Sequence, residues 1–350
     1  MRSLIDITDL NTAELDELIK LAMDIIAFPE RYAQSCSGRQ LATLFFEPST
    51  RTRMSFESAM MSLGGKVISM TDGATSSVSK GESVADTAKI VSCYADIIAI
   101  RHPKEGAALV AAKNASIPVI NAGDGGHCHP TQTLADLLTI YREKGRFNGL
   151  TIGFCGDLKY GRTVHSLINA MTRYPDNRFV LISPKELAIP DYSLKTISES
   201  GLEFEVTTSL EDALPKLDVL YMTRIQKERF DDPDEYERLK NSYCLTPEKM
   251  MAAKQDCIVL HPLPRVNEIS VKLDDDPRVA YFRQAKNGKY MRMALILKLL
   301  DEAKDPQKRG LACGRISDRK CSNPKCISHF EQEFENEYDD LGRCIYCDSL

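Results

Sequence analysis

The sequence predicts an α/β protein with two lobes, each holding a parallel sheet flanked by helices, and a small C-terminal zinc-binding β domain. Three observations support this prediction. From about Gln40, short apolar runs rich in β-branched residues alternate with longer amphipathic segments. Nine such runs occur, which suits two sheets better than one. Four cysteines lie within the last thirty residues, which marks the C-terminal tail as a separate unit.

Each predicted strand is a short apolar run bounded by turn-forming or polar residues, as expected for strands buried in a parallel sheet. In chain order they are Leu41–Phe46, Lys66–Met70, Ala95–Ile100, Ile117–Asn121, Thr151–Cys155, Arg178–Ser183, Glu203–Val206, Val219–Thr223 and Cys257–His261. Strands that alternate with helices in this way favour parallel pairing with helices on both faces.

Helix-length segments lie between these strands. Ser49–Leu63 ends at a pair of glycines and Thr133–Lys144 ends at a single glycine, both of which are stop signals. Thr163–Arg173 is a third helical segment, and Lys289–Asp305 carries an apolar stripe at helical spacing.

We expect the two lobes to meet within the helix that follows His129–Pro130. The first domain then spans residues 1–132 and is completed by a helix at 287–305, and the second spans residues 133–286. Residues 306–350 form a polar linker and the zinc-binding domain. Residues 331–340 carry six acidic side chains, which predicts a solvated loop or hairpin.

Composition excludes several classes of protein. Of 350 residues, 43% are hydrophobic and 27% are charged, which is ordinary for a globular protein. No apolar run approaches the roughly 18 residues that span a bilayer, and the first ten residues have no secretory apolar stretch. With 45 basic and 50 acidic residues, the net charge of −5 argues against a nucleic-acid coat protein. Eleven cysteines, an odd number, argue against a disulfide framework. We therefore expect a cytoplasmic protein that binds neither membrane nor nucleic acid.

Arginines gather where the predicted strands end. In open parallel sheets ligands bind beyond the carboxyl ends of the strands. Five of six such turns place an arginine at this edge, although the protein has a negative net charge: Arg51, Arg101, Arg162, Arg224 and Arg265. The planar guanidinium matches phosphate and carboxylate groups. The sequence therefore predicts a site for a small poly-anionic molecule.

The turn Ser49-Thr50-Arg51-Thr52 lies where a strand leads into a helix. The unpaired N–H groups and the dipole of a helix start favour an anion, and the hydroxyls and the guanidinium add donors. An alternative stays open, in which Ser49 or Thr50 only caps the helix and Arg51 and Arg53 are solvated. The sequence has neither a Walker lysine pattern nor a G-x-G-x-x-G in this turn, so ATP and dinucleotide cofactors find little support.

Five motifs within residues 1–305 resemble those of the transcarbamoylases, and they occur in the family's order. Two are shared by the whole family and three are similar to the aspartate carbamoyltransferase catalytic chain in particular. The shared motifs are residues 46–52 (FEPSTRT) and 129–132 (HPTQ), and the particular ones are residues 156–166 (GDLKYGRTVHS), 221–230 (YMTRIQKERF) and 261–265 (HPLPR).

The resemblance implies transfer of the carbamoyl group of carbamoyl phosphate to L-aspartate, the committed step of pyrimidine biosynthesis, with no cofactor in catalysis. The ornithine family typically has His-Cys-Leu-Pro where this chain has His261-Pro262-Leu263-Pro264. Arg162 and Arg224 would anchor the two carboxylates of aspartate. A transcarbamoylase for another amino acid and a non-catalytic scaffold remain as alternatives.

The resemblance also implies a role for each matching residue. Catalytic roles fall to Arg51, Thr52, Arg101 and His129. The residues implied to bind carbamoyl phosphate are Ser49, Thr50, Arg51, Thr52, Ser76, Lys80, Arg101, His129, Gln132, Leu263 and Pro264. Those implied to bind aspartate are Lys80, Arg162, Arg224, Gln226 and Leu263. Thr52, Arg101 and His129 would face the carbonyl oxygen, where negative charge develops in the transition state.

Plainer roles stay open for single residues. A histidine or glutamine after a strand is more often a cap or a satisfied core group than a catalytic group. Arg53 and Arg265 are equally expected to be structural ion-pair partners. The histidines left without a catalytic role are His102, His127, His165 and His261.

Two loops are implied to complete the site. The composition of Thr71–Ser83 is that of a flexible surface loop. In the family the matching loop enters a neighbouring subunit, with Ser76 and Lys80 at the matching positions. The resemblance therefore implies a homotrimer or a higher oligomer with shared active sites. The charged stretch Lys227–Asn241 is a candidate loop that closes on aspartate.

The C-terminal tail carries Cys321-x4-Cys326 and, after seventeen residues, Cys344-x2-Cys347. Four thiolates at this spacing predict one structural Zn²⁺ per chain with no open coordination position. His329 is a substitute ligand that the pattern does not need. The alternative is four free cysteines.

A second resemblance concerns this tail. Residues 321–329 (CSNPKCISH) are similar to the zinc domain of the aspartate carbamoyltransferase regulatory chain. In that family the zinc domain docks on the catalytic chain, and a preceding domain binds CTP or ATP. No such domain fits between Asp305 and Cys321. Control by nucleotide effectors is therefore left open, and a role of the tail in assembly is favoured.

Overall fold

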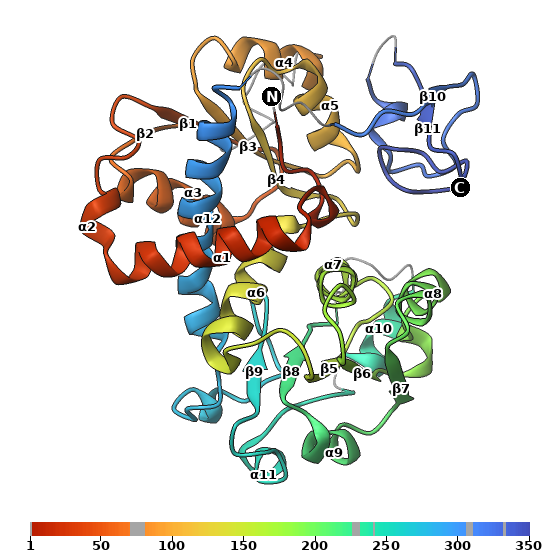
Figure 1. Cartoon of the computed structure of the whole chain (residues 1–350). Helices are drawn as coiled ribbons and strands as arrows, with labels where there is room; N and C mark the ends of the chain where they lie inside the picture. The colour runs from red at the N-terminus through yellow and green to blue at the C-terminus, as the bar shows by residue number, and fades with distance from the viewer. Residues whose placement is uncertain (1, 71–80, 226–231, 241, 306–310, 332–333) are drawn as a thin grey trace. The chain divides into compact units, whose positions relative to one another are not determined.

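The computed structural model describes residues 2–70, 81–225, 232–240, 242–305, 311–331 and 334–350. The chain forms two compact units (Figure 1). The first comprises Met1–Thr131 and Lys289–Leu350, and the second comprises Gln132–Gly288. Each unit holds one parallel sheet, which confirms the predicted two-lobed α/β class.

The sheet of the first unit has four parallel strands in the order β2-β1-β3-β4. They are β1 (Gln40–Phe45), β2 (Lys66–Met70), β3 (Ile97–His102) and β4 (Val119–Asp124). Strands β3 and β4 are buried throughout, which explains their continuous apolar runs. Both start and end two or three residues later than predicted, and parallel pairing continues past the apolar residues to the bridge between His102 and Asp124.

The helices of the first unit surround this sheet (Figure 1). They are α1 (Thr12–Ala27), α2 (Pro29–Tyr32), α3 (Thr50–Ser62), α4 (Val84–Val91), α5 (Ala107–Asn114) and the C-terminal part of α12 (Tyr281–Glu302). Helix α1 was not among the predicted segments. Its start is well marked, because Asn11 Oδ1 accepts a hydrogen bond from Glu14 N (3.0 Å) and Glu14 Oε2 accepts one from Asn11 N (2.9 Å).

The sheet of the second unit has five parallel strands in the order β7-β6-β5-β8-β9. They are β5 (Thr151–Cys155), β6 (Arg178–Ile182), β7 (Glu203–Thr207), β8 (Val219–Met222) and β9 (Ile258–Leu260). The helices are α6 (Pro130–Lys144), α7 (Arg162–Met171), α8 (Asp191–Glu199), α9 (Leu210–Ala213), α10 (Pro233–Leu239) and α11 (Pro247–Met250). All nine predicted strands are therefore present, with ends displaced by up to three residues.

Two helices start at least three residues earlier than predicted. Helix α6 begins at Pro130, since proline is well suited to the first helical position. Helix α12 begins at Tyr281 and passes through Gly288, whereas the prediction started it at Lys289. The added turns are fixed by buried polar contacts, in which Gln284 Nε2 donates to Asp136 (2.6 Å) and Asn287 Nδ2 donates to Thr139 (2.9 Å). These contacts offset the cost of a glycine within the helix.

The tail (residues 311–350) contains a two-stranded antiparallel sheet of β10 (Arg315–Ile316) and β11 (Glu337–Tyr338). The expectation of a solvated segment at 331–340 was wrong for part of it, because Tyr338 is buried against the cysteines and Glu331 binds another element. Short 3-10 helices occur at Ile7–Asp9, Lys185–Leu187, Leu214–Lys216, Val271–Leu273 and Ile327–His329. Among the described residues, no helix is long and apolar enough to span a membrane.

Candidate active site

In each sheet the strand order reverses once, between β1 and β3 in the first unit and between β5 and β8 in the second. Connections on the two sides of such a switch point leave in opposite directions, so a crevice opens there at the carboxyl ends of the strands. The turn at Ser49–Thr52 follows β1, and Arg101 lies in β3 directly opposite Phe45. Arg162 follows β5, and Arg224 follows β8. The candidate residues therefore occupy the switch point of each unit.

Helix α3 presents its N-terminus at the first switch point. Ser49 occupies the N-cap position, but its side chain makes no capping hydrogen bond, so the reading of Ser49 as a plain cap is not supported. Thr50 and Arg51 are exposed and Thr52 is half-buried. The first amide groups of this helix lack partners within it, as the N-terminus of any α-helix does, and they can therefore donate to an anion.

Arg101 is 9% exposed and lies at the base of this site. Its Nη2 is 3.1 Å from Glu47 Oε2, and its Nη1 donates to the carbonyl of Ala122 (3.4 Å). A Cβ atom at Gly123 would lie 2.7 Å from Arg101 Nη1, and Gly123 has a φ of +121°. Only glycine therefore fits at this position beside the guanidinium. The pairing with Glu47 was not predicted, although Glu47 belongs to the motif at residues 46–52.

His129 is 6% exposed and precedes α6. Its Nδ1 lies 3.5 Å from Thr131 Oγ1, which accepts a hydrogen bond from Arg292 Nη2 (3.4 Å). The same guanidinium donates to Ser55 Oγ in α3 (3.1 Å). Arg292 therefore connects the α3 segment to the His129 segment. Sequence reasoning missed it, and the only signal was a charged residue beside the apolar stripe of α12.

Buried hydrogen bonds join the two turns at the second switch point. Asp157 N donates to Thr223 Oγ1 (2.9 Å), and Asp157 Oδ1 accepts from Tyr160 N (2.9 Å). Asp157 belongs to the turn that leads to Arg162, and Thr223 directly precedes Arg224. Arg162 and Arg224 are both half-buried, and the buried residue Asp157 links the two turns that position them.

His165 holds the turn that leads to Arg162 through contacts of both ring nitrogens. Its Nε2 lies 2.7 Å from the carbonyl oxygen of Leu158, and its Nδ1 lies 3.1 Å from the hydroxyl of Tyr192. Burial lowers the pKa of His165 below its usual value, which favours the neutral ring that these two contacts require. His165 is thus a satisfied structural histidine, as expected.

The turn after β9 is held by His261, which had been left without a role. Leu263 N donates to His261 Nδ1 (2.7 Å), and His261 Nε2 lies 2.7 Å from Glu268 Oε1. Burial acts to raise the pKa of Glu268, but its hydrogen bonds with His261 and with backbone amides outweigh this effect and lower it. Leu263 has a φ of +55°, which orients its backbone unusually for a branched residue. The next residue, Pro264, is exposed.

Gln132 lies in the first turn of α6 and belongs to the second unit. Its Nε2 donates to Asp136 Oδ1 (2.7 Å). Asp136 is fully buried and also accepts from the hydroxyl of Tyr221 (3.1 Å). This network fixes the orientation of the Gln132 amide.

Not every candidate can be placed. Ser76, Lys80 and Gln226 lie outside the described residues, as does part of the stretch Lys227–Asn241. The two arginines that were equally expected in ion pairs do form them. Arg53 pairs with Glu57 (3.5 Å) and Arg265 pairs with Asp274.

The four tail cysteines converge on one point. All four Sγ atoms lie within 4.8 Å of one another, with Cys321 to Cys347 at 3.4 Å and Cys326 to Cys344 at 3.9 Å. A tetrahedral Zn²⁺ site with Zn–S bonds of about 2.3 Å has S–S edges of about 3.8 Å, so the cluster fits that ion. His329 is turned away, since its Nε2 contacts the carbonyl of Cys321 (2.9 Å).

The tail packs against the rest of the first unit through a short backbone pairing. Glu105 N donates to the carbonyl of Lys325 (3.1 Å), and Ile327 N donates to the carbonyl of Glu105 (2.9 Å). Gly106 permits this approach, because a Cβ atom there would lie 2.5 Å from Tyr346 Cβ. The φ of Gly106, +87°, also favours glycine.

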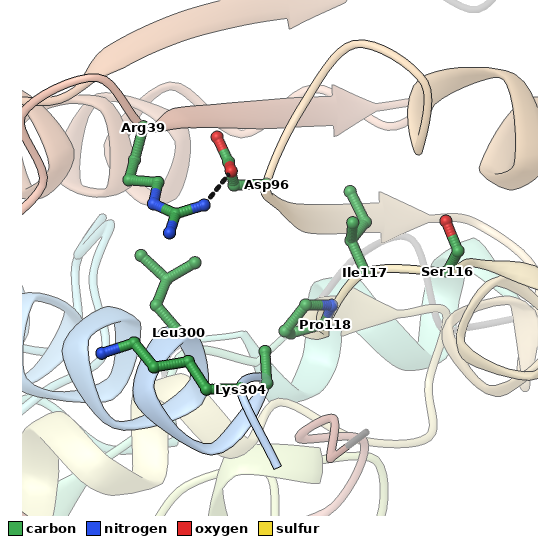
Figure 2. Close-up of a pocket in the computed structure, with 8 residues that line it drawn as sticks. Arg39, Asp96, Ser116, Ile117, Pro118, Leu300 and Lys304 are labelled. Carbon is green, nitrogen blue, oxygen red and sulfur yellow. Dashed lines mark hydrogen bonds and ion pairs between the residues drawn. The ribbon is translucent and has the colours of Figure 1, made fainter. Parts of the chain in front are cut away.

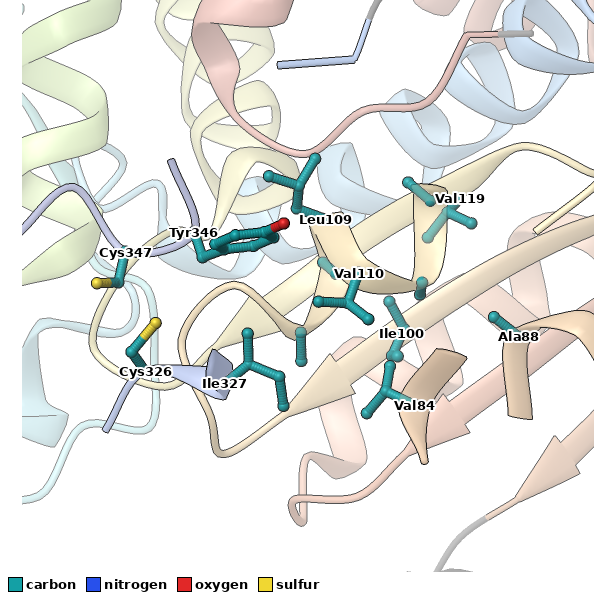
Figure 3. Packing of buried hydrophobic residues seen from close by; sticks show 14 of the residues in the cluster. Val84, Ala88, Ile100, Leu109, Val110, Val119, Cys326, Ile327, Tyr346 and Cys347 are labelled. Carbon is teal, nitrogen blue, oxygen red and sulfur yellow. The ribbon is translucent and has the colours of Figure 1, made fainter. Parts of the chain in front are cut away.

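Apolar and charged contacts complete this docking. Ile327 and Tyr346 join the buried cluster built around α5, and Figure 3 shows them beside Val110. Lys113 of α5 pairs with Glu337 and contacts the Tyr346 hydroxyl. Glu331 Oε1 accepts from Val84 N at the start of α4 (2.9 Å), where a carboxylate also interacts favourably with the helix dipole.

A separate hollow in the first unit lies away from the candidate residues (Figure 2). It is lined by Arg39, Asp96, Ser116, Ile117, Pro118, Leu300, Ala303 and Lys304. Arg39, Asp96 and Pro118 immediately precede β1, β3 and β4, so the hollow lies at the amino ends of the strands. Arg39 Nη1 donates to Asp96 Oδ1 (2.6 Å) across it. Ligands of open parallel sheets bind at the opposite edge.

Comparison with known proteins identifies the family. The family model described as aspartate/ornithine carbamoyltransferase, carbamoyl-P binding domain, matches residues 2–142, and the Asp/Orn binding domain model matches residues 148–299. The aspartate carbamoyltransferase catalytic subunit of Clostridium novyi is 62% identical over 299 residues, which cover 85% of this chain and 98% of the relative. That of Clostridium acetobutylicum is 60% identical over 300 residues, with the same coverage.

The chain belongs to the aspartate carbamoyltransferase catalytic-subunit family.

Solved structures of this family agree with the fold. The catalytic subunit of M. jannaschii aspartate transcarbamoylase has a TM-score of 0.82 at 48% identity, and the match covers 87% of this chain and all of that subunit. The Trypanosoma cruzi enzyme in complex with N-(phosphonacetyl)-L-aspartic acid has a TM-score of 0.80 at 39% identity, and the match covers 85% of this chain and 95% of that enzyme's chain. These matches confirm the resemblance drawn from the five motifs and the prediction of a transferase. The family models end at residue 299, before the tail.

Proposed function

We propose that this chain transfers the carbamoyl group of carbamoyl phosphate to the amine of L-aspartate, giving N-carbamoyl-L-aspartate and phosphate. The observation that carries this proposal is the placement of family motifs at the switch points of both sheets. Arginines and a helix N-terminus are gathered there, as two anionic substrates require. The reaction supplies carbamoyl-aspartate for pyrimidine synthesis.

In the first unit, the residues Ser49–Thr52 bind the phosphate through the N-terminus of α3 and the Arg51 guanidinium. Arg101, Thr52 and His129 face the carbonyl oxygen. The aspartate amine attacks the carbonyl carbon, and the developing oxyanion is stabilised by these donors before the bond to phosphate breaks. The amine proton leaves with the phosphate. Positioning and charge account for the rate enhancement, with no organic cofactor.

In the second unit, Arg162 and Arg224 bind the two aspartate carboxylates, with Gln226 as a further donor. The backbone at Leu263 and Pro264 and the amide of Gln132 orient the carbamoyl and amine groups. Ser76 and Lys80 act in a neighbouring subunit of a homotrimer. The shared site would make the trimer the smallest active assembly.

The four tail cysteines hold one Zn²⁺ per chain, which serves the structure of the tail. About forty residues bury little core of their own, so the ion would supply much of the folding free energy of the tail. We place the protein in the cytoplasm, where this pathway operates and where reduced thiolates persist.

The test is the initial rate of carbamoyl-aspartate formation against L-aspartate concentration, with L-ornithine as the control acceptor. We expect turnover with aspartate and none with ornithine. Turnover with ornithine alone, or with neither acceptor, would overturn the proposal. The same rate measurements in the presence of CTP and of ATP test control by nucleotides. If the rate depends hyperbolically on aspartate concentration and neither nucleotide changes the curve, the tail serves stability or assembly.

A further inference from the structure

The tail contacts the loop between β4 and α6, which carries His129. His127 Nε2 lies 2.9 Å from Asp348 Oδ2 in the tail, and His127 Nδ1 lies 3.2 Å from Asp124 Oδ2 at the end of β4. One residue separates His127 from His129. The imidazole of His127 is therefore held between one carboxylate of the sheet and one carboxylate of the tail.

We propose that the tail sets the position of His129 through the contact between Asp348 and His127, which makes both of them positioning residues for carbamoyl transfer. This inference rests on the catalytic role of His129 in the proposed function. It gives the tail a part in the reaction itself, in addition to stability or assembly.

The sheet side of this contact is rigid. Asp124 is 1% exposed and accepts hydrogen bonds from Gly106 N (2.9 Å), Asn121 Nδ2 (3.0 Å) and Cys128 N (3.0 Å). A carboxylate with this many buried partners has one available orientation. Asp124 thus fixes one side of the His127 ring, and the other side depends on the tail.

The tail side depends on the cysteine cluster. Asp348 follows Cys347 directly, and its backbone N donates to the carbonyl of Cys344 (2.8 Å). The Asp348 side chain is 62% exposed, so little besides the Cys344–Cys347 turn and His127 restrains it. A metal ion bound by the Cys344–Cys347 turn would therefore also fix the position of the carboxylate that holds His127.

A second contact reaches the same loop. Gly126 N donates to Glu105 Oε1 (3.2 Å), and the other oxygen of Glu105 accepts from the tail residue Asn323. The loop is thus attached to the tail at two adjacent residues, at His127 directly and at Gly126 through Glu105. Such a bridge restricts the backbone of residues 125–129 more than the sheet alone would.

Asp124, His127 and Cys128 also lie close enough to hold a metal ion of their own. Hydrogen bonds already account for these side chains, since Cys128 Sγ donates to Asp6 Oδ2 (2.9 Å) and both nitrogens of His127 face carboxylates. The proposal therefore expects one Zn²⁺ per chain, in the tail. Two ions per chain, with one lost in His127→Ala, would overturn it.

The experiment uses the full chain with Asp348→Ala, Asp348→Asn, His127→Ala and the double variant Asp348→Ala/His127→Ala. Asp340→Asn is the matched control, because Asp340 is exposed and pairs with Arg315 within the tail. The measurements are kcat, both KM values, zinc content, oligomer size, and hydrogen–deuterium exchange of residues 124–132.

We expect Asp348→Ala to lower kcat about three- to tenfold and to speed amide exchange across residues 124–132, with zinc content, oligomer size and the KM for aspartate unchanged. Asp348→Asn, which keeps an acceptor oxygen, should recover most of kcat. His127→Ala should match Asp348→Ala, and the double variant should be no worse than either single one. Asp340→Asn should behave as wild type.

Wild-type kcat together with wild-type exchange in Asp348→Ala would overturn the proposal, as would effects of the two alanine variants that multiply in the double variant. The exchange measurement does not require turnover. If the wild-type chain does not carbamoylate aspartate, the proposed function fails, while the exchange data still decide whether the tail restrains the His129 loop.

Discussion

The backbone N of Leu263 donates a hydrogen bond of 2.7 Å to Nδ1 of His261. Because this nitrogen accepts, the proton of the neutral ring lies on Nε2, which donates to Glu268 (2.7 Å). The same glutamate accepts from Val266 N (3.1 Å) through its other oxygen. The imidazole and one carboxylate thus fix the backbone of the turn assigned to aspartate and the carbamoyl group.

His261→Ala should raise the KM for L-aspartate about tenfold, which corresponds to about 1.4 kcal/mol, because the Leu263 amide loses its acceptor and the turn relaxes. Steady-state kinetics with aspartate as the varied substrate measures this. Phosphate binding at α3, in the other unit, should be unchanged and serves as the control. An unchanged KM with only a lower stability would show that His261 has no part in substrate binding.

Arg51→Ala should lower kcat by a factor that corresponds to at least several kcal/mol while leaving the fold intact. Arg51 is an exposed residue at the N-terminus of α3, so we expect the fold to tolerate the change, but the change removes a cation next to the phosphate. Circular dichroism and initial rates measure the two effects. Arg31→Ala, in α2, is the control for loss of an exposed arginine. Wild-type turnover in Arg51→Ala would refute the site assignment.

Glu47→Gln should tighten the binding of carbamoyl phosphate by a factor of about three to ten. Glu47 pairs with Arg101 at 3.1 Å, so the anion must compete with this carboxylate for the guanidinium. A partly exposed pair of this kind contributes roughly 1 kcal/mol. Isothermal titration with carbamoyl phosphate, without aspartate, measures the change. Weaker binding in the variant would mean that Glu47 assists the anion instead of competing with it.

Acidification should destabilise the chain through His102. Burial lowers the pKa of His102 to about 4 from the usual 6.5, so the folded state holds the ring neutral. The unfolded chain binds more protons between these values, and stability is lost as the pH falls from about 6.5 towards 4. The loss between pH 7 and 4.5 is about 2–3 kcal/mol.

His102→Asn should remove this pH-dependent loss, since the amide oxygen can replace Nδ1 as acceptor for Lys104 N (3.0 Å) without binding a proton. Urea denaturation at pH 7 and pH 4.5 compares the two proteins. An equal loss of stability in both would assign the acid sensitivity to other groups.

Cys344→Ser should reduce the zinc content from one ion per chain to nearly none and release the tail from α5. The remaining three thiolates do not complete a tetrahedral site, and the tail has little other core. Elemental analysis gives the zinc content, and limited proteolysis reports exposure of residues 311–350. Cys313→Ser is the control, because Cys313 is exposed and lies outside the cluster. Full zinc retention in Cys344→Ser would refute the four-cysteine site.

The sequence predicted the sheets and the turns of the site for one physical reason. Parallel strands buried on both faces are continuous apolar runs, and their carboxyl ends face one edge. Residues such as Arg101 and Arg224 could therefore be assigned to that edge from their place after a strand. The cysteine spacing similarly indicated a cluster before any geometry was known.

The partners of these residues could not be predicted. Arg292 contacts Ser55 across 237 positions of the chain, and a lone arginine in a helix gives no sign of such a contact. The pairing of Glu47 with Arg101 and the hold of His261 on Leu263 depend on side-chain directions that the strand pattern leaves open. The start of α12 was placed too late because the apolar stripe that indicated it begins at Met293, whereas the preceding turns are held by buried amide contacts of Gln284 and Asn287.

Because the tail that packs on Glu105 and Gly106 is part of the same chain, its binding does not depend on the protein concentration. A separate subunit with the same contacts would dissociate as its concentration falls. A tail joined to its docking surface by the same chain has a fixed effective concentration, which does not change when the protein is diluted. Whatever the docked tail contributes should therefore persist at the low concentrations of an enzyme assay, where a two-chain assembly would have come apart.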